Sequence, residues 1–296
     1  MERNGLAAPS ITMPWQERSG AFSPFRLAVF LAVVAPAAWL AGRALLGDLG
    51  PRPLTEAIHT TGLWTVRLLL ATLAVTPVRR ILGWSRLAAV RRMLGLATMS
   101  YALGHIGLYI ADMDLNLPRV ASEIVLRIYL TIGFAALLGL TVLGATSTNG
   151  WIRRLGGRGW QRLHRIVYVV ALLGALHFFM QSKLDIGQPA WMTGLLLYLL
   201  AARLVVRQGA TARAAALLPL GVLAAAATAL MEAGWYAVNN GAPILRVLAA
   251  NLDGRMTPAL WVLVVTTAFS LLAAALPRRR AGAAMIARAV REAGAR

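Results

Sequence analysis

Long apolar runs dominate this 296-residue sequence, and they limit the possible fold more than any other feature. A helix needs about 20 mainly apolar residues, within a range of about 17–25, to cross the hydrocarbon core of a bilayer. Runs of this kind cover residues 25–46, 58–77, 92–111, 124–146, 163–182, 190–206, 214–232 and 257–276. Charged residues make up only 14% of the chain, against about 25% in soluble proteins. The sequence therefore predicts an all-α integral membrane protein, a polytopic bundle of about eight transmembrane helices.

The segments between and beyond these runs are short. Residues 1–24 predict a flexible cytoplasmic tail, and residues 277–296 predict a basic cytoplasmic tail. The longest connection, 233–256, has the length of a loop, so we expect no soluble domain. We expect no cleavable signal peptide either, because the first apolar run starts late and is long enough to span the membrane.

The charges predict how the spans are oriented. Basic residues outnumber acidic ones by 30 to 11, for a net charge of +19. In a soluble protein this imbalance would suggest nucleic acid, but the apolar excess makes membrane lipid the expected partner. With eight spans, 22 basic residues fall on one side and seven on the other, and Arg67 lies within a span. Because cytoplasmic loops collect Lys and Arg, both termini are expected in the cytoplasm.

The chemistry of the chain is expected to depend on histidine. There is no cysteine, which excludes disulfides, thiolate metal sites, iron–sulfur clusters and covalent c-type haem. The four histidines, His59, His105, His164 and His177, all lie in or at the ends of apolar runs. An ionisable residue inside a membrane is costly and suggests function, although a neutral imidazole can also simply bond neighbouring helices.

His105 and His177 are expected at similar depth, towards the outer ends of two helices that run in the same direction. Two imidazoles that face each other at equal depth are what a b-type haem needs. Gly95 and Gly174 lie near these histidines in the sequence and could admit a flat ring, but ordinary helix packing explains them better.

The other polar residues in the spans leave alternatives open. His164 lies 13 residues before His177, about 20 Å along a helix, at the level of Arg91 and Arg92. It could bind a haem with a different sixth ligand, contact a flavin or quinone, or anchor the helix end. His59 could bond a haem propionate or a quinone oxygen. Arg67 could pair with a propionate or extend towards the interface.

Residues 56–183 resemble the MsrQ (YedZ) family, the haem-binding membrane subunits of the periplasmic methionine sulfoxide reductase system. The matching segments are IHTTG (58–62), LLATLAVTPVRR (69–80), RRMLGLATMSYALGHIGLY (91–109), YLTIGFAALLGLTVLGATST (129–148) and RLGGRGWQRLHRIVYVVALLGALHFFMQSK (154–183). All four histidines lie in matching places. The broader superfamily is the ferric-reductase-like transmembrane domain, which the resemblance assigns to residues 25–206.

The resemblance implies haem b, an electron path from the quinone pool with FMN as a candidate carrier, and a bacterial inner-membrane location. It also implies a periplasmic molybdopterin partner, MsrP. By position, His105 and His177 would be the haem pair and His164 a further candidate ligand. The sequence departs from the family by adding two helices within 207–276, to which we assign no role. No G-x-G-x-x-G fingerprint follows a strand, so electrons are not expected from a nicotinamide bound by this chain.

These observations predict an electron-transfer subunit of an oxidoreductase complex. Quinol, or a reduced flavin near Arg91, Arg92 and His164, would supply electrons to haem at His105 and His177, and the periplasmic partner would repair oxidised methionines. The chain itself offers no catalytic centre for sulfoxide reduction. One alternative is a transmembrane ferric-reductase-like haem carrier with another periplasmic acceptor. The other is a non-redox transporter or scaffold whose histidines are structural or relay protons.

Overall fold

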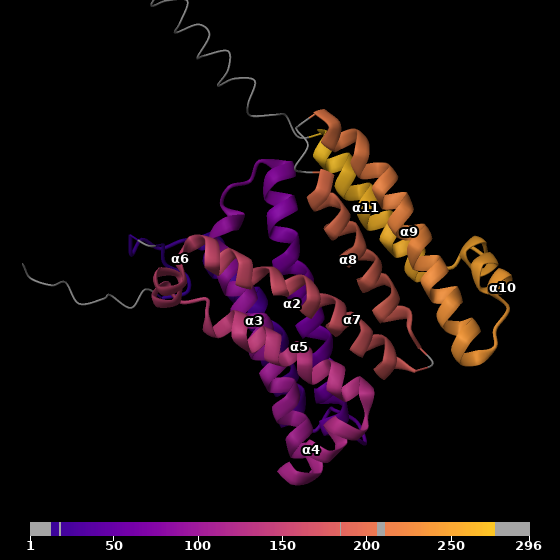
Figure 1. The fold of residues 1–296 in the computed structure, drawn as a ribbon, viewed down its shortest axis with the longest axis horizontal. Helices are drawn as coiled ribbons and strands as arrows, with labels where there is room; N and C mark the ends of the chain where they lie inside the picture. Colours follow the sequence, from indigo (N-terminus) through magenta and orange to yellow (C-terminus); the bar gives the residue numbers. More distant parts are fainter. Residues whose placement is uncertain (1–12, 18, 184, 206–210, 276–296) are drawn as a thin grey trace, which may run out of the picture.

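The computed structural model describes residues 13–17, 19–183, 185–205 and 211–275, which form a bundle of α-helices (Figure 1). The helices are α1 (Pro24–Leu45), α2 (Pro53–Leu82), α3 (Leu87–Asp112), α4 (Leu117–Leu126), α5 (Ile128–Ala145), α6 (Asn149–Leu163), α7 (Val167–Ser182), α8 (Gly187–Val205), α9 (Thr211–Asn240), α10 (Ile244–Ala249) and α11 (Pro258–Ala275). Short 3-10 turns cover His164–Ile166 and Ala250–Leu252. Within the described residues the only β pairing is an isolated bridge between Gln16 and Phe22.

The predicted fold class is confirmed, because the chain is all-α and crosses a membrane several times. Seven helical segments of the described chain are long and apolar enough to span: α1, α2, α3, α5, α6 joined to α7, α9 from residue 216, and α11. The predicted count of eight also includes α8, which is less apolar because it carries Gln188 and Arg203. Because α8 packs among other helices, it can carry polar side chains that would be costly on a helix facing lipid.

Two predicted boundaries are wrong. The predicted span 124–146 joins two helices that the structure separates at Arg127, whose backbone is extended (φ −111°, ψ 105°). The Arg127 side chain pairs with Glu123 in the short helix α4. The predicted loop 233–256 instead contains the end of α9, all of α10 and a 3-10 turn. In both places hydropathy shows which residues are apolar, but it does not show where the backbone leaves or enters a helix.

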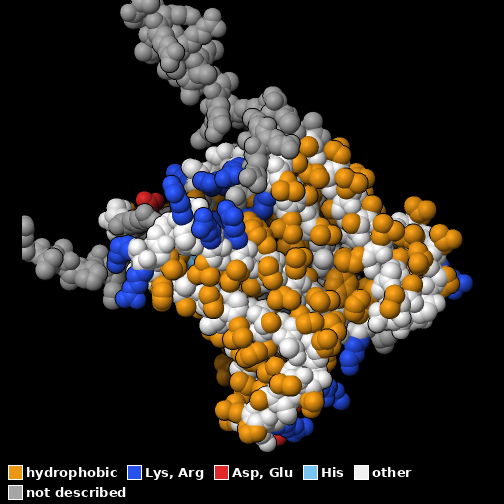
Figure 2. All heavy atoms as spheres, viewed as in Figure 1, with side chains coloured by type: hydrophobic (Ala, Val, Ile, Leu, Met, Phe, Trp, Pro, Cys, Tyr) orange, Lys and Arg blue, Asp and Glu red, His pale blue; other side chains and the backbone are white. Residues whose placement is uncertain are grey.

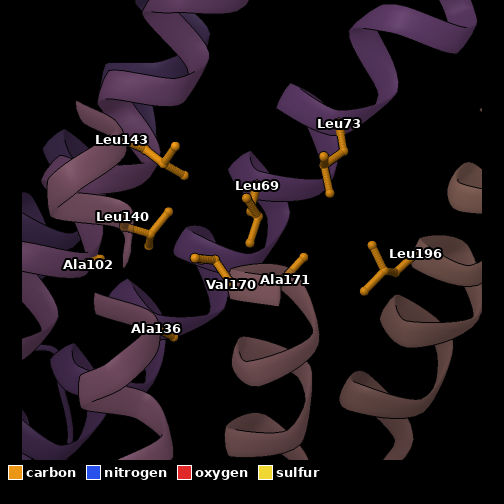
Figure 3. Packing of buried hydrophobic residues seen from close by; sticks show 9 residues of the cluster. All are labelled: Leu69, Leu73, Ala102, Ala136, Leu140, Leu143, Val170, Ala171 and Leu196. Atoms are coloured by element: carbon orange, nitrogen blue, oxygen red, sulfur yellow. The ribbon is translucent and has the colours of Figure 1, made fainter. Parts of the chain in front are cut away.

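Two groups of buried side chains hold the bundle together, and α8 contributes to both. The first group joins α2, α3, α5, α7 and α8 (Figure 3) and consists of Leu69, Leu73, Ala102, Ala136, Leu140, Leu143, Val170, Ala171 and Leu196. The second joins α8 to α9 and α11 and consists of Tyr198, Ala202, Leu217, Ala224, Ala225 and Val262. At Gly194 on α8 the missing side chain leaves room for Thr228 of α9 and Val262 of α11. The two C-terminal helices therefore pack onto the rest of the bundle mainly through α8, and the Phe179 ring of α7 also contacts the Trp235 ring of α9 (5.4 Å between centres).

The two ends of the bundle differ in charge. One end, which we call the arginine-rich end, comprises the C-terminal turns of α2 and α8, the N-terminal turn of α3, and α6; arginines gather there in Figure 2. The opposite end holds every ion pair of the described chain: Arg43–Asp48 (3.3 Å), Arg43–Glu56 (3.7 Å) and Arg127–Glu123. The segment before α1 lies against the bundle, since the Trp15 ring packs 5.6 Å from that of Phe30. The predicted tails lie mostly outside the described residues, at 1–12 and 276–296.

Prolines interrupt the backbone hydrogen bonding of α1 and α2, and side chains from neighbouring helices bond the backbone groups at those places. Pro77 has no N–H to offer the carbonyl of Leu73, four residues earlier, and a guanidinium nitrogen of Arg203 (α8) donates to that carbonyl instead. Beside Pro36 in α1, the hydroxyl of Tyr101 (α3) donates to the carbonyl of Val33 (2.8 Å) and accepts from the Ala37 N–H (3.0 Å). These bonds fix α1 to α3 and α2 to α8.

Candidate metal centre

The structure brings His105 of α3 and His177 of α7 together within the bundle. Their ring centres lie 6.4 Å apart, and the ring planes are nearly perpendicular, at 82°. An imidazole nitrogen binds a transition metal at about 2.0–2.1 Å and lies about 1.2 Å from its ring centre, so two rings on opposite sides of one metal ion have centres about 6–6.5 Å apart. The observed separation therefore fits a single metal ion held between the two histidines.

Both imidazoles are oriented in the same way by backbone carbonyls. Because a carbonyl oxygen can only accept, Nδ1 of His105 donates to the Ile58 carbonyl of α2 (2.9 Å). Nδ1 of His177 likewise donates to the Tyr129 carbonyl of α5 (2.8 Å). In each ring this leaves the lone pair on Nε2, the nitrogen that would bind metal. A second bond of this kind fixes the tautomer of a ligating histidine and raises its basicity.

A glycine faces each ring on the helix that supplies its carbonyl. A Cβ atom at Gly62 would lie 3.1 Å from Nδ1 and Cε1 of His105, and a Cβ at Gly133 would lie 2.6 Å from Nδ1 of His177. Each glycine follows its carbonyl residue by four positions, so one helical turn provides both the acceptor and the space. The two sites are thus built alike, from Ile58 and Gly62 on α2 and from Tyr129 and Gly133 on α5.

The two histidines do not form a complete protein site for a free metal ion. No group of three or more His, Cys, Asp or Glu side chains that could hold a metal occurs in the described part of the chain. Two imidazole nitrogens suit an ion whose remaining ligands come from a bound cofactor. His105 and His177 would therefore suit a haem iron, the role that the sequence predicts for them.

A separate cavity of about 1430 Å³ opens at the arginine-rich end and contains the second group of predicted residues. Arg91, Arg92 and His164 all line it, and its deeper wall is apolar, with Leu69 of α2 and Leu140 of α5 among the lining residues. The Arg92 guanidinium is also bonded to the side chain of Asn149 (3.0 Å). The three residues expected to act together thus share one cavity, on a different level from the histidine pair.

Both ring nitrogens of His164 already have protein partners. Nδ1 lies 3.1 Å from the carbonyl oxygen of Trp160, and Nε2 lies 3.4 Å from the hydroxyl of Ser147. The ring stacks on the Trp160 indole, with centres 3.8 Å apart, and the indole N–H donates to the Thr146 carbonyl (2.9 Å). His164 therefore forms a polar wall of the cavity, at the turn where α6 meets α7.

The remaining two predicted residues have no hydrogen bond or ring contact with either histidine of the pair in the described chain, although His59 lies within electrostatic range of His105. His59 is exposed on α2, next to the carbonyl of Ile58 that orients His105. Arg67 is half-buried, and its guanidinium covers the ring of Trp64 at 4.8 Å from the ring centre. It makes no ion pair with any described residue.

Sequence reasoning missed the residues that position the histidines. Gly174, which it considered, has no atom within 4 Å of an added Cβ, and Gly95 has only Thr72. Close helix packing, the explanation favoured for these glycines, is therefore not seen at Gly174, and at Gly95 it is limited to one ordinary contact. A signal for the real contacts was present: Gly62 and Gly133 lie at the outer ends of the neighbouring helices, at the depth expected for the two histidines.

Known proteins resemble this chain over much of its length. Residues 61–175 match the family described as "Ferric reductase like transmembrane component". A Rhodospirillum rubrum protein is 43% identical over 192 residues, which are 64% of this chain and 92% of that protein. A Xanthomonas campestris pv. campestris protein is 44% identical over 192 residues (62% and 88%), and one from Caulobacter vibrioides is 38% identical over 162 (54% and 77%).

All three relatives carry the name "Protein-methionine-sulfoxide reductase heme-binding subunit MsrQ". No solved structure matches the chain. The Rhodospirillum protein is covered almost completely at 43% identity, and the histidine pair lies within or just beyond the matched transmembrane component. The chain therefore belongs to the MsrQ family of heme-binding subunits of protein-methionine-sulfoxide reductase.

Proposed function

We propose that this chain is the haem b membrane subunit of a protein-methionine-sulfoxide reductase. In this role it carries electrons from the quinone pool, with FMN as a candidate intermediate carrier, to a periplasmic molybdopterin-containing partner of the MsrP kind. Sulfoxide reduction takes place on the partner. The observation that carries the proposal is the opposed pair His105 and His177, with ring centres 6.4 Å apart and both Nδ1 atoms bonded to carbonyls.

Haem b supplies a reversible one-electron couple when it is bound. His105 and His177 would hold the haem iron from two helices, and with both imidazoles bound the iron would have no position left for oxygen or substrate. The carbonyls of Ile58 and Tyr129 hold the imidazoles in one orientation, so little rearrangement accompanies a change in charge. Such a site favours electron transfer over chemistry on a bound substrate.

The cavity with Arg91, Arg92 and His164 is the proposed site of the electron donor. Its apolar wall suits a flat flavin or quinone ring, and its arginines suit an anionic group such as the phosphate of FMN. A further arginine, Arg26 of α1, also lines the cavity, and its buried Nε has no partner among the described residues. A ligand oxygen at that nitrogen would satisfy it.

The charge distribution supports the proposed orientation in a bacterial inner membrane. The arginine-rich end would face the cytoplasm, and the histidine pair would lie nearer the periplasm, where the partner would accept electrons. Within this arrangement residues 25–206 are the haem-binding unit and 207–276 a two-helix extension, between cytoplasmic tails at 1–24 and 277–296. In this division α8, which packs on both sides, joins the extension to the haem-binding unit.

Optical spectra test the proposal directly. Purified full-length protein should give reduced-minus-oxidised bands of low-spin haem b at one haem or more per chain. His105→Ala and His177→Ala should each remove the low-spin signal of this site. His59→Ala is the matched control, since His59 lies on the same end of the bundle but is exposed, and it should keep the signal.

A wild-type protein without haem bands would contradict both electron-transfer interpretations and favour a transporter or scaffold. Haem retained in full by both alanine variants would contradict the assignment of the pair. Co-purification with a periplasmic molybdopterin enzyme separates the proposed function from a ferric-reductase-like carrier. Delivery of electrons to ferric chelates alone, with no such partner, would favour the carrier.

A further inference from the structure

Positive side chains from three helices meet beside the cavity at the arginine-rich end. Arg91 of α3 lies within electrostatic range of Arg79 on α2, of Arg203 on α8 and of the Tyr168 hydroxyl on α7. Arg79 and Arg203 are half-buried, and Arg91 is more exposed. Arg91 also lines the cavity described above, but Arg79, Tyr168 and Arg203 do not. We treat these four side chains as one cluster, which shares only Arg91 with the cavity lining.

The cluster contains donors that the protein leaves without acceptors. Arg203 uses two guanidinium nitrogens, one towards the Tyr168 hydroxyl (2.7 Å) and one towards the Leu73 carbonyl, while its Nε–H is buried with no partner among the described residues. The Tyr168 oxygen accepts from Arg203, and its own proton meets no acceptor in the described chain. Buried donors are almost always paired, so this arrangement indicates a missing acceptor.

No carboxylate among the described residues forms an ion pair with the three arginines. The ion pairs of the described residues all lie at the opposite end of the bundle, and none includes Arg79, Arg91 or Arg203. Neither Arg79 nor Arg91 makes a hydrogen bond with a described side chain or carbonyl. Like charges repel more strongly near an apolar interior than in water, so an anion bound among these arginines would reduce their repulsion.

We propose that Arg79, Arg91, Arg203 and the Tyr168 hydroxyl form a binding site for a phosphate group. Guanidinium forks bind phosphate oxygens through paired, charge-assisted hydrogen bonds, and the tyrosine offers one more donor. Arg79 and Arg203 lie near the C-terminal ends of α2 and α8, and Arg91 and Tyr168 lie near the N-terminal ends of α3 and α7, all at the arginine-rich end. With that end at the membrane surface, a lipid headgroup would lie beside them. The phosphate could come from an anionic phospholipid or from solution, and these sources can be separated experimentally.

The test uses the full chain, purified and delipidated in a neutral detergent. Its unfolding temperature is followed by tryptophan fluorescence while dioctanoyl phosphatidylglycerol, dioctanoyl phosphatidylcholine, inorganic phosphate or chloride of equal ionic strength is added. A ligand that binds only the folded protein raises the unfolding temperature. Phosphatidylglycerol should act at lower concentration than phosphatidylcholine, with chloride inactive. Inorganic phosphate as effective as phosphatidylglycerol would identify a free-phosphate site; a much weaker effect would identify a lipid site.

Two variants remove one charge each without breaking a bond seen in the described chain. Without ligand, Arg79→Gln and Arg91→Gln should unfold at the same or a higher temperature than wild type, because repulsion is relieved. Each should also need about tenfold or more ligand for half the stabilisation, the usual value of a charge-assisted bond. Arg119→Gln, exposed at the opposite end, is the matched control and should respond as wild type does.

Three outcomes would overturn the site. These are no stabilisation by either anion beyond chloride, equal stabilisation by the two lipids, and Arg79→Gln and Arg91→Gln proteins that respond like wild type. The haem spectrum of Arg79→Gln should be unchanged, so failure here is distinguishable from failure of the proposed electron-transfer function.

Discussion

Substituting Gly133 by alanine should weaken haem binding, because the new methyl group would occupy the space of the His177 ring. The added Cβ would lie 2.6 Å from Nδ1, 2.8 Å from Cε1 and 3.0 Å from Cγ. Since non-bonded heavy atoms settle at about 3.5–4.0 Å, the ring must retreat by roughly 0.9 Å. A metal–nitrogen bond of about 2.0 Å does not survive such a displacement unchanged.

The expected magnitude follows from the cost of adding atoms to a packed interior, about 1–3 kcal/mol. If that cost falls on the bound state, the dissociation constant for haem rises by about 5–150-fold. At Gly62 the added Cβ would lie 3.1 Å from the His105 ring, which needs a shift of only about 0.4 Å. Gly62→Ala should therefore weaken binding by less than about fivefold.

Haem titration of the purified apoprotein, followed by absorbance and electron paramagnetic resonance, measures both variants. Gly174→Ala is the matched control, since a Cβ there meets no atom within 4 Å although the residue lies one turn from His177. We expect Gly133→Ala to bind most weakly and to show altered low-spin signals. Wild-type affinity and spectrum in Gly133→Ala, or an equal loss in Gly174→Ala, would refute the reasoning.

Three further substitutions probe the packing around the site. Tyr101→Phe removes the hydroxyl that joins α1 to α3 and should lower the free energy of unfolding by about 1 kcal/mol in a detergent titration, with an unchanged haem spectrum. Arg203→Met should cost about 1–2 kcal/mol alone but measurably less when Pro77→Ala restores an N–H for the Leu73 carbonyl; equal costs in both backgrounds would contradict that role. Gly194→Val should destabilise the protein by about 1–3 kcal/mol through collision with α9 and α11, yet leave the haem-to-protein ratio intact.

Much of the architecture could be predicted from the sequence because the bilayer imposes a length and a composition on each span. Depth along a helix follows from residue count, so the approach of His105 to His177, and of His164 to Arg91 and Arg92, could be expected from position alone. The break at Arg127 could not, because apolar residues on both sides continue the pattern of a span. Periodicity reports which residues are apolar, not where the backbone turns.

The contacts that orient the histidines could not be predicted from the sequence either, for a different reason. They depend on which helices are neighbours, and no pattern within α3 or α7 indicates that α2 faces His105 and α5 faces His177. The same holds for the bond between Arg203 and the carbonyl of Leu73, which joins residues 130 positions apart. A proline or glycine inside an apolar span indicates that another helix contacts the span at that position, but it does not indicate which helix.

The junction between α4 and α5 links an exposed helix to the carbonyl that orients the His177 ring. α4 is short and presents exposed apolar side chains, including Val125 and Leu126, and a single extended residue, Arg127, joins it to α5. Tyr129, whose carbonyl holds the ring, is only the second residue of α5. A displacement of α4 would therefore act at Arg127, two residues before the carbonyl that orients the His177 ring.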